Sequence, residues 1–204
     1  MNRARQDPIP VDAADDAAVI KQSVREPERF GIIFDRHAAH IHRYLARRLN
    51  AELADDLVGE TFLTAFDSRK RYDLTRQDAR PWLYGIATNL SRRHHRAELS
   101  AYRLRHALGP EPTGPSHADQ VADDVTAQAL RSVLTTALSE LSDGDRDVLL
   151  LIAWEQLSYD EVAAALAIPI GTVRSRLHRA RQQVQKSIGH TNPSNIAEEK
   201  VRHG

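Results

Sequence analysis

The sequence contains no cysteine, which excludes disulfides and metal sites built from thiolates. It has no apolar run long enough to span a membrane, and its start, MNRARQDPIPVDAADD, lacks the apolar stretch of a secretory signal. The alternation of β-branched and polar residues that indicates strands is scarce, whereas Ala, Leu and Arg are abundant. These absences predict an all-α, cytoplasmic protein that does not insert into a membrane.

A net charge is lacking too, because 28 Lys and Arg residues balance 28 Asp and Glu residues. The charges are nevertheless segregated. Seven acids and one base lie between Glu140 and Glu161, whereas five bases and no acid lie between Thr172 and Lys186. Since a polyanion responds to local charge, the second segment predicts a surface that attracts nucleic acid. The upstream acids would be repelled by DNA, so we expect them to lie on the far side of that surface.

Apolar residues at helical spacing occur in two separate stretches of the chain. In the first stretch, helices are predicted after Pro27 as far as Asn50, over 54–66 and over 82–105, with a polar loop at 67–80. The segment LGPEPTGPSHADQVADD can form neither a helix nor a core, so it is interpreted as a linker. The prediction is two small helical domains joined by a Pro/Gly/acid-rich linker: a flexible extension at 1–25, a domain at 26–107, the linker at 108–124, a domain at 125–188 and a flexible tail at 189–204.

The second domain contains two signatures of a helix start. Ser142 is followed three residues later by Asp145, and Ser158 is followed three residues later by Glu161. Ahead of them an apolar stripe marks one more helix; its members are Leu130, Val133, Leu134, Leu138 and Leu141.

The end of this domain has the pattern of a helix-turn-helix. A short helix over 158–167 is followed by the turn Ile168-Pro169-Ile170-Gly171 and then by a basic helix. Arginines on such a helix can donate twice to guanine or hold a phosphate, and the Thr172 hydroxyl with the free amides of the helix start can hold a phosphate oxygen. The inward stripe would consist of Val173, Leu177, Ala180 and Val184. The alternative is a solvated basic face on an ordinary bundle helix, which does not account for the turn, the helix-start signatures and the missing acids together.

The segment SYDEVAAALAIPIGTVRSRLHRAR resembles region 4 of the sigma factors of bacterial RNA polymerase, most closely the small extracytoplasmic-function (ECF) type. The resemblance implies that this helix-turn-helix reads the −35 promoter element and sits on the flap of the β subunit. Beside Thr172, it implies base or phosphate contacts for Arg174, Ser175, Arg176, His178 and Arg179. His178 stands where the family often has another aromatic or basic residue, so its base preference stays open.

The first domain carries an independent resemblance. ADDLVGETFLTAF is similar to region 2.2, which docks on the coiled coil of the β′ subunit. The resemblance implies that Asp55, Asp56 and Glu60 supply carboxylates there and that Leu57 supplies an apolar contact. Gly59 departs from the pattern, in which a longer polar residue is common. Taken alone, the acids fit an ordinary solvated helix face equally well.

The segment RPWLYGIATNLSRRHHR resembles regions 2.3 and 2.4, which handle the −10 element. Exposed bases stack on aromatic rings and their phosphates need arginine, so this chemistry suits a melted strand. The residues implied for −10 binding are Tyr72, Asn89, Arg92, Arg93 and Arg96. Trp82 is interpreted as a core residue. Ser91 and the pair His94-His95 stand where the family usually has an acid, which leaves the base preference open.

The ten histidines show no ligand spacing such as H-E-x-x-H, and neither a Gly-rich phosphate loop nor a G-x-S-x-G elbow is present. We therefore expect no metal, no cofactor and no enzymatic activity. The predicted function is a sigma factor that takes core RNA polymerase to promoter DNA, with an inhibitory anti-sigma protein as a further partner that the resemblance implies. The alternative is a free-standing helix-turn-helix regulator, which would need a ligand pocket or phospho-acceptor arrangement in its first domain.

Overall fold

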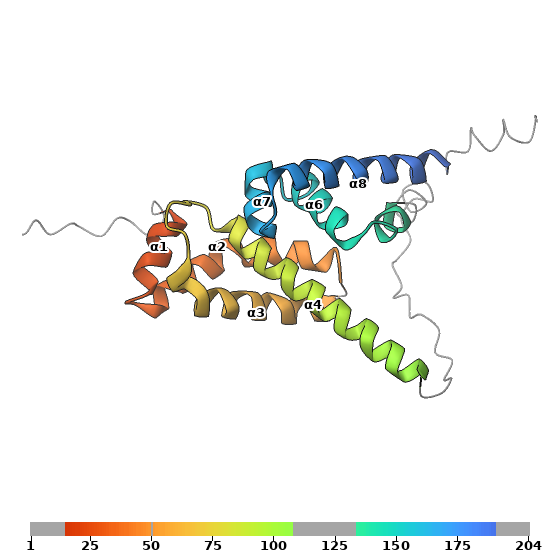
Figure 1. The fold of residues 1–204 in the computed structure, drawn as a ribbon. Coiled ribbons are helices and arrows are strands. Elements are labelled where there is room, and N and C mark those ends of the chain that lie inside the picture. The colour runs from red at the N-terminus through yellow and green to blue at the C-terminus, as the bar shows by residue number, and fades with distance from the viewer. Residues whose placement is uncertain (1–14, 50, 108–133, 191–204) are drawn as a thin grey trace, which may run out of the picture. The chain divides into compact units, whose positions relative to one another are not determined.

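The computed structural model describes residues 15–49, 51–107 and 134–190 (Figure 1). In these ranges every regular element is a helix, so the all-α prediction is confirmed for them. None of these helices is both long and apolar enough to cross a bilayer. The elements are α1 (Asp16–Ser23), η1 (Pro27–Phe30), α2 (Gly31–Ala46), α3 (Ala51–Ser68), η2 (Arg69–Arg71), α4 (Arg80–Ala107), α6 (Asp143–Ala153), α7 (Tyr159–Leu166) and α8 (Ile170–His190).

The chain forms two compact units; the main division between them falls within α4 after Arg93, and Ala164–Leu166 are grouped with the first unit. Because α4 is one continuous helix, α1 to α4 are described together as the N-terminal module. Residues 134–190 are the C-terminal module. The predicted linker at 108–124 and the start of the predicted second domain, including Leu130 and Val133, lie outside the described residues.

The core of the N-terminal module lies where α2 and α3 pack together with the first half of α4. At its centre the rings of Tyr44 and Tyr84 meet edge to face, with centroids 5.2 Å apart. The Tyr44 hydroxyl is 2.7 Å from the hydroxyl of Thr88, so a fully buried phenol keeps a hydrogen-bond partner. The aliphatic side chains around them are Ile33, Ile41, Leu45, Ala54, Leu57, Leu83 and Ala87.

Helix α1 corrects the sequence interpretation, because the predicted flexible extension at 1–25 is wrong for residues 16–23. Asp15 caps the helix by accepting a hydrogen bond from the N–H of Ala18 at 2.7 Å, and Val19 and Ile20 are buried. Figure 1 shows α1 across the end of the module where η1 and η2 lie. The helix is only 8 residues long, too short for apolar periodicity to mark it in the sequence. Residues 1–14 lie outside the described ranges.

The other helices of this module match the predicted pattern with shifted ends. Helix α3 runs on to Ser68 and is followed by η2, so the first residues of the predicted loop at 67–80 are helical. Helix α4 begins at Arg80, with Pro81 in its first turn, where a missing N–H costs nothing.

In the C-terminal module both helix-start signatures are confirmed. Ser142 accepts a hydrogen bond from the N–H of Asp145 at 3.3 Å. Ser158 and Glu161 form a reciprocal capping box, in which Ser158 N–H donates to the carboxylate at 2.7 Å and Glu161 N–H donates to the hydroxyl at 3.3 Å. These caps fix where α6 and α7 begin and therefore orient the helix-turn-helix.

The helix-turn-helix is formed by α7, the turn at 167–169 and α8. Ala167 ends α7 with a positive φ of 51°, the left-handed conformation that commonly terminates a helix. The predicted stripe on α8 is confirmed, since Val173, Leu177 and Ala180 are buried and Val184 is half-buried. Among the residues of the stripe before α6 that lie within 134–190, Leu141 is buried, Leu138 is half-buried and Leu134 is exposed. Helix α8 continues to His190, past the predicted start of the tail at 189.

Candidate nucleic-acid interface

The outer surface of α8 gathers the residues that the sequence assigned to the −35 element. Because the apolar stripe faces inward, the opposite side of the helix is centred on Ser175, His178 and Arg179, which are exposed. Arg174, also exposed, lies at one margin of this side, and Arg176, half-buried, at the other. Thr172 is half-buried in the first turn, and its carbonyl accepts a hydrogen bond from the Ser175 hydroxyl at 3.1 Å.

Arg179 is held in place by Asp145 of α6. Its guanidinium donates to both carboxylate oxygens, at 2.9 and 3.3 Å. These hydrogen bonds, together with the negative charge of Asp145, raise the pKa of Arg179. The Asp145 side chain is almost buried, whereas 57% of the Arg179 side chain stays exposed. The expectation that the upstream acids all lie away from the basic surface is therefore wrong for Asp145, which orients an arginine at the centre of that surface.

Arg176 lies against the first turn of α6. A Cβ atom built on Gly144 would come within 2.8 Å of an Arg176 guanidinium nitrogen, so the glycine leaves the space that this side chain occupies. Nothing in the local sequence around Gly144 indicated this role, because the two residues lie 32 positions apart.

On α4 the predicted −10 residues form a second basic surface. Asn89, Arg93 and Arg96 are exposed on successive turns of one side of the helix, and Arg92 is half-buried beside them. Arg93 donates to the carboxylate of Glu60 on α3. Both side chains are partly exposed, so this ion pair is weak and can exchange with other partners.

Tyr72 does not offer a face for base stacking in this structure, and that prediction is wrong. The residue is 8% exposed, and its hydroxyl donates to the carbonyls of Arg76 at 2.7 Å and Asp78 at 3.2 Å. Burial, reinforced by the charge of Asp16, raises the pKa of this phenol. Its ring packs against Trp82 with centroids 4.9 Å apart, so Tyr72 folds the loop back onto the start of α4.

The outer face of α3 carries most of the acids that were predicted to bind polymerase. The apolar residue on this face is Leu63, whereas the sequence predicted Leu57. Leu57 is 3% exposed and packs in the core, so the prediction that it contacts polymerase is wrong. Leu63 is 62% exposed and shares the outer face with Asp56 and Glu60, at helical spacings of seven and three residues. The sequence interpretation missed Leu63, although that spacing could have revealed it.

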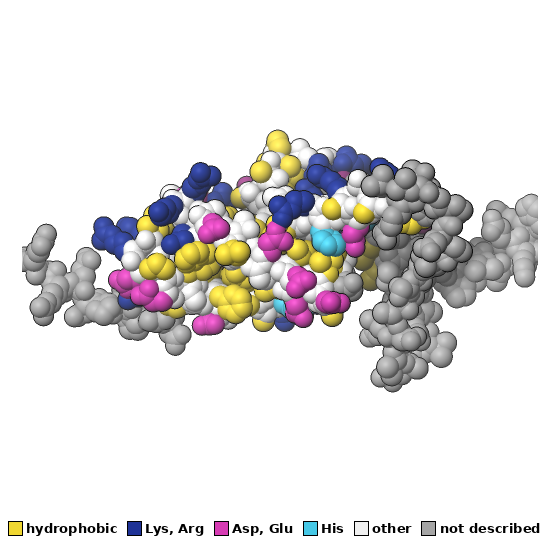
Figure 2. Space-filling view, turned by 90° about the horizontal axis from the view of Figure 1, so that it is seen from below, with side chains coloured by type: hydrophobic (Ala, Val, Ile, Leu, Met, Phe, Trp, Pro, Cys, Tyr) yellow, Lys and Arg dark blue, Asp and Glu magenta, His cyan; other side chains and the backbone are white. Residues whose placement is uncertain are grey.

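Figure 2 shows apolar side chains set among acidic ones on the face of the N-terminal module that includes α3. Asp55 is exposed at the edge of this face and lies 3.1 Å from the imidazole of His42. A Cβ atom on Gly59 would meet no neighbour within 4 Å, so packing does not require the glycine.

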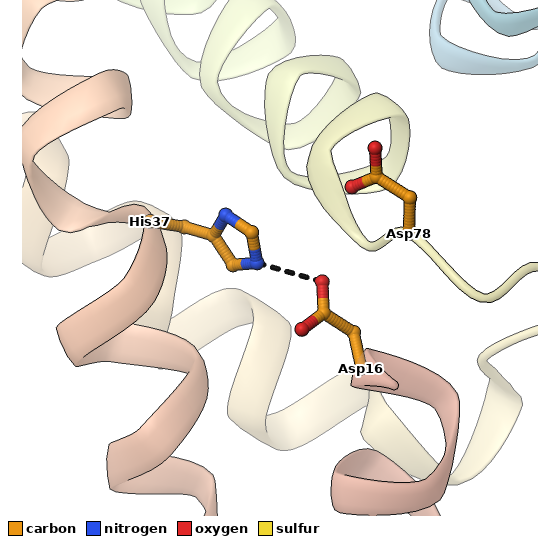
Figure 3. Close-up of side chains that lie close together, drawn as sticks. All are labelled: Asp16, His37 and Asp78. Atoms are coloured by element: carbon orange, nitrogen blue, oxygen red, sulfur yellow. Dashed lines mark hydrogen bonds and ion pairs between the residues drawn. The ribbon is translucent and has the colours of Figure 1, made fainter. Parts of the chain in front are cut away.

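A cluster of Asp16, His37 and Asp78 ties α1 to the rest of the module (Figure 3). The Asp16 carboxylate accepts hydrogen bonds from His37 Nε2 at 2.7 Å, from the N–H of Ala79 at 3.0 Å and from Arg36 at 2.9 Å. Burial by itself would raise the pKa of Asp16, but the hydrogen bonds from His37 and Ala79, together with the charges beside them, lower it to about 2.

The same cluster has the residue types of a metal site, with one potential ligand atom from each residue lying within 4.8 Å of the others. Its charges do not suit a divalent cation, however. The Arg36 guanidinium donates to Asp16, and the Arg80 side chain donates to Asp78 at 2.8 Å, so each carboxylate already neutralises a cation. The contacts of the cluster are those of a structural anchor for α1.

The chain matches two families that occur in the same order as its two modules. Residues 33–100 match the family described as Sigma-70 region 2, and residues 131–184 match Sigma-70, region 4. The matches thus cover the α4 surface and the α8 surface separately.

Curated relatives match most of the chain. The RNA polymerase sigma factor CarQ of Myxococcus xanthus is 33% identical over 79% of this chain and 90% of its own length. The ECF RNA polymerase sigma factor SigC of Mycobacterium tuberculosis is 36% identical over 69% of this chain and 73% of its own length, and SigW of Bacillus subtilis is 28% identical over 83% and 97%.

Solved structures share the fold at lower identity. The sigma factor RpoE in complex with the anti-sigma factor NepR from Bartonella quintana has a TM-score of 0.59 and 22% identity, covering 78% of this chain and 96% of that one. CnrH in complex with the cytosolic domain of CnrY also has a TM-score of 0.59, with 23% identity, covering 86% and 97%. With both regions matched in order and relatives at this level of identity, the chain belongs to the ECF group of the sigma-70 family of RNA polymerase sigma factors.

Proposed function

We propose that this chain binds core RNA polymerase and directs it to promoters by contacting the −35 element through α8 and the −10 element through α4. The observation that carries the proposal is the presence of two exposed arginine surfaces on two separate modules, each within a matched sigma region. One basic helix would suit any helix-turn-helix regulator, but the region 2 match and its acidic, apolar α3 face favour a polymerase subunit over a free-standing regulator.

The residues to which we assign roles are all exposed or half-buried on the surfaces described above. For the −35 element we propose Thr172, Arg174, Ser175, Arg176, His178 and Arg179, and for the −10 element Asn89, Arg92, Arg93 and Arg96. For the β′ coiled coil we propose Asp55, Asp56, Glu60 and Leu63. The composition of residues 108–124 supports a tether between the modules. The N-terminal module begins at α1 and not at residue 26.

Further parts of the proposal concern the cell. We propose that the protein acts in the cytoplasm and has no catalytic activity of its own. We also propose that it is held inactive by an anti-sigma protein, since RpoE, which shares its fold, was solved in complex with the anti-sigma factor NepR. The β flap is proposed as the site on polymerase that receives the C-terminal module.

Reconstituted transcription tests the function directly. Core polymerase alone should ignore promoters that it initiates from once this protein is added, and mapping of start sites should reveal a shared −35 and −10 sequence upstream of them. If the protein instead binds duplex promoter DNA tightly by itself and core polymerase adds nothing, it is a free-standing regulator and the proposal is wrong.

The α3 face can be tested separately through Leu63. We expect Leu63→Asp to weaken binding to core polymerase by about 2 kcal/mol, or roughly 30-fold, because an apolar anchor in a protein interface is replaced by a desolvated charge. Binding would be measured by titrating labelled protein with core polymerase.

Ala39→Asp is the control, since Ala39 is exposed on α2 and receives the same added charge. It should bind within about twofold of the wild type, because it lies on a different helix and on the side opposite the buried residues of α2. Equal loss in both variants would mean that charge alone, and not this face, determines binding.

A further inference from the structure

The side of α8 that faces α6 is held at several points. The side-chain amide of Gln183 donates to the carbonyl of Glu140 at 3.0 Å, and the hydroxyl of Ser187 donates to the Glu140 carboxylate at 3.0 Å. Arg179 donates to Asp145. Helices α6 and α8 lie side by side (Figure 1). The direction of the side chains on this side of α8 therefore depends on α6 and on the residues just before it.

Arg176 lies on the same side of α8 and is held differently. It is half-buried, yet within the described ranges its guanidinium has no hydrogen-bond or ion-pair partner. A guanidinium carries five N–H donors. Those of Arg176 are therefore available to a ligand, whereas Arg179 shares its donors with Asp145.

Shape, and not a bonded partner, sets where the Arg176 guanidinium lies. A Cβ atom built on Gly144 would come within 2.8 Å of its Nη1, 2.9 Å of its Cζ and 3.3 Å of its Nε. The group thus covers the first turn of α6 at the position that has no side chain. Any side chain there would meet the flexible end of Arg176, which would move before the backbone does.

Electrostatics at this turn do not hold Arg176 by themselves. The N-terminus of a helix carries a partial positive charge, which opposes a cation placed over it. The two acids that flank Gly144, Asp143 and Asp145, offset this charge. Each of them already forms an ion pair with another arginine of the module. The space above Gly144 therefore fixes the direction of Arg176.

This direction matters because arginine recognises a base through geometry. Two N–H groups of the planar fork donate to O6 and N7 of guanine, so a guanidinium that is displaced or turned loses the contact. Arg176 and Arg179 are three residues apart on neighbouring turns of α8, so the two can contact neighbouring positions of one DNA site. A change of one residue on α6 can therefore alter which base α8 selects.

We propose that Gly144 is a specificity-determining position for the −35 element, because the space above it directs the Arg176 guanidinium toward one base pair of that element. Gly144 contributes no side chain to the interface and acts through Arg176, so it is a positioning residue. This inference rests on the proposed function.

Gly144→Ala adds one methyl group under the guanidinium. In polymerase reconstituted with this variant, we expect initiation from the preferred promoters to fall about 5- to 30-fold and base preference to relax at one position of the −35 element. The unfolding temperature should be unchanged or higher, since alanine is the better helix former. A role in stability alone would instead change the unfolding temperature and leave base preference as it is. The measurements are transcription from promoters randomised at −35, with sequenced transcripts, and thermal unfolding of the full-length protein.

A double-mutant cycle with Arg176→Ala separates positioning from other effects of the methyl group. Arg176→Ala should relax preference at the same position, and Gly144→Ala should add less than about twofold in that background. Independent effects that multiply would overturn the inference. So would wild-type base preference in either single variant, or a Gly144→Ala variant that weakens initiation equally at all −35 sequences.

Gly31→Ala is the matched control, because Gly31 lies in the first turn of α2 and a Cβ atom there would meet nothing within 4 Å. It should change initiation by less than about twofold and leave base preference unchanged. A wild type with a clear −35 preference that Gly144→Ala retains would overturn this inference alone. A wild type that directs no initiation would refute the proposed function and the inference with it.

Discussion

Arg179→Ala should lower initiation from −35-dependent promoters by about 1–3 kcal/mol, or about 5- to 150-fold, and should relax base preference within that element. Arg179 lies at the centre of the outer surface of α8, and its guanidinium is oriented by the two hydrogen bonds that it donates to Asp145. An arginine fixed in this way loses little freedom when it binds a base, so it should contribute more than the flanking Arg174. The measurement is transcription from promoters randomised at −35, read out by sequencing the transcripts.

The substitution also leaves the almost buried Asp145 carboxylate without its cation, which destabilises the C-terminal module. The double variant Asp145→Asn/Arg179→Ala removes that charge, so it should recover much of the free energy of unfolding without recovering promoter selection. If promoter selection returns together with stability, Arg179 has only a structural role. If the slope of log initiation against log salt becomes shallower by about one unit while base preference stays the same, Arg179 holds a phosphate and reads no base.

Arg181→Ala serves as the matched control on the same helix. Arg181 is exposed but lies off the outer surface centred on Ser175 and His178, so its loss should leave −35 selection unchanged. Equal effects of the two substitutions would show that only the total charge of α8 matters.

Asp16→Asn should lower the free energy of unfolding of the N-terminal module by about 3–5 kcal/mol, because it removes the buried partner of two cationic or polar side chains. The carboxylate is the common acceptor for Arg36, His37 and the N–H of Ala79, and it links α1 to α2 and to the start of α4. The side-chain amide of Asn has one oxygen acceptor and no charge, so it can replace only some of these interactions. The measurement is chemical denaturation at neutral pH, with Asp35→Asn as control; Asp35 is exposed on α2, and its loss should change the free energy by less than about 0.5 kcal/mol.

The same carboxylate predicts a pH dependence. Its pKa is about 2 in the folded protein, below the ordinary value of 3.8, so the unfolded chain binds its proton more readily. The stabilisation is therefore present above about pH 4 and is lost as the pH falls toward 2, and it amounts to about 2 kcal/mol. The difference in unfolding free energy between wild type and Asp16→Asn should shrink over this window. A constant difference from pH 5 to 2 would contradict the anchoring role of Asp16.

What the sequence determined by itself was local. Helix caps depend on residues three positions apart, so the caps at Ser142 and Ser158 follow from short stretches of the sequence alone. The inward stripe of α8 was predictable because its apolar residues lie on one side only, which leaves the arginines on the other. The segregation of charge and the motifs of the two sigma regions can likewise be read from short stretches of the sequence alone.

Only the tertiary structure decided which residues pair between helices and which side chains face the core. Helix α3 carries apolar residues on more than one side, and the packing of its neighbours determines that Leu57 is buried while Leu63 faces solvent. Tyr72 is a core residue because its hydroxyl donates hydrogen bonds to two carbonyls of its own loop.

The contacts that hold the functional side chains join residues far apart in the chain. Asp145 is 34 residues from Arg179, and Asp16 is 63 residues from Ala79. Helical periodicity assigns a residue to one side of its own helix, but it does not specify which other helix packs against that side. Those pairings are selected by the packing of the whole module, because a buried charge is stable only where its partners meet it.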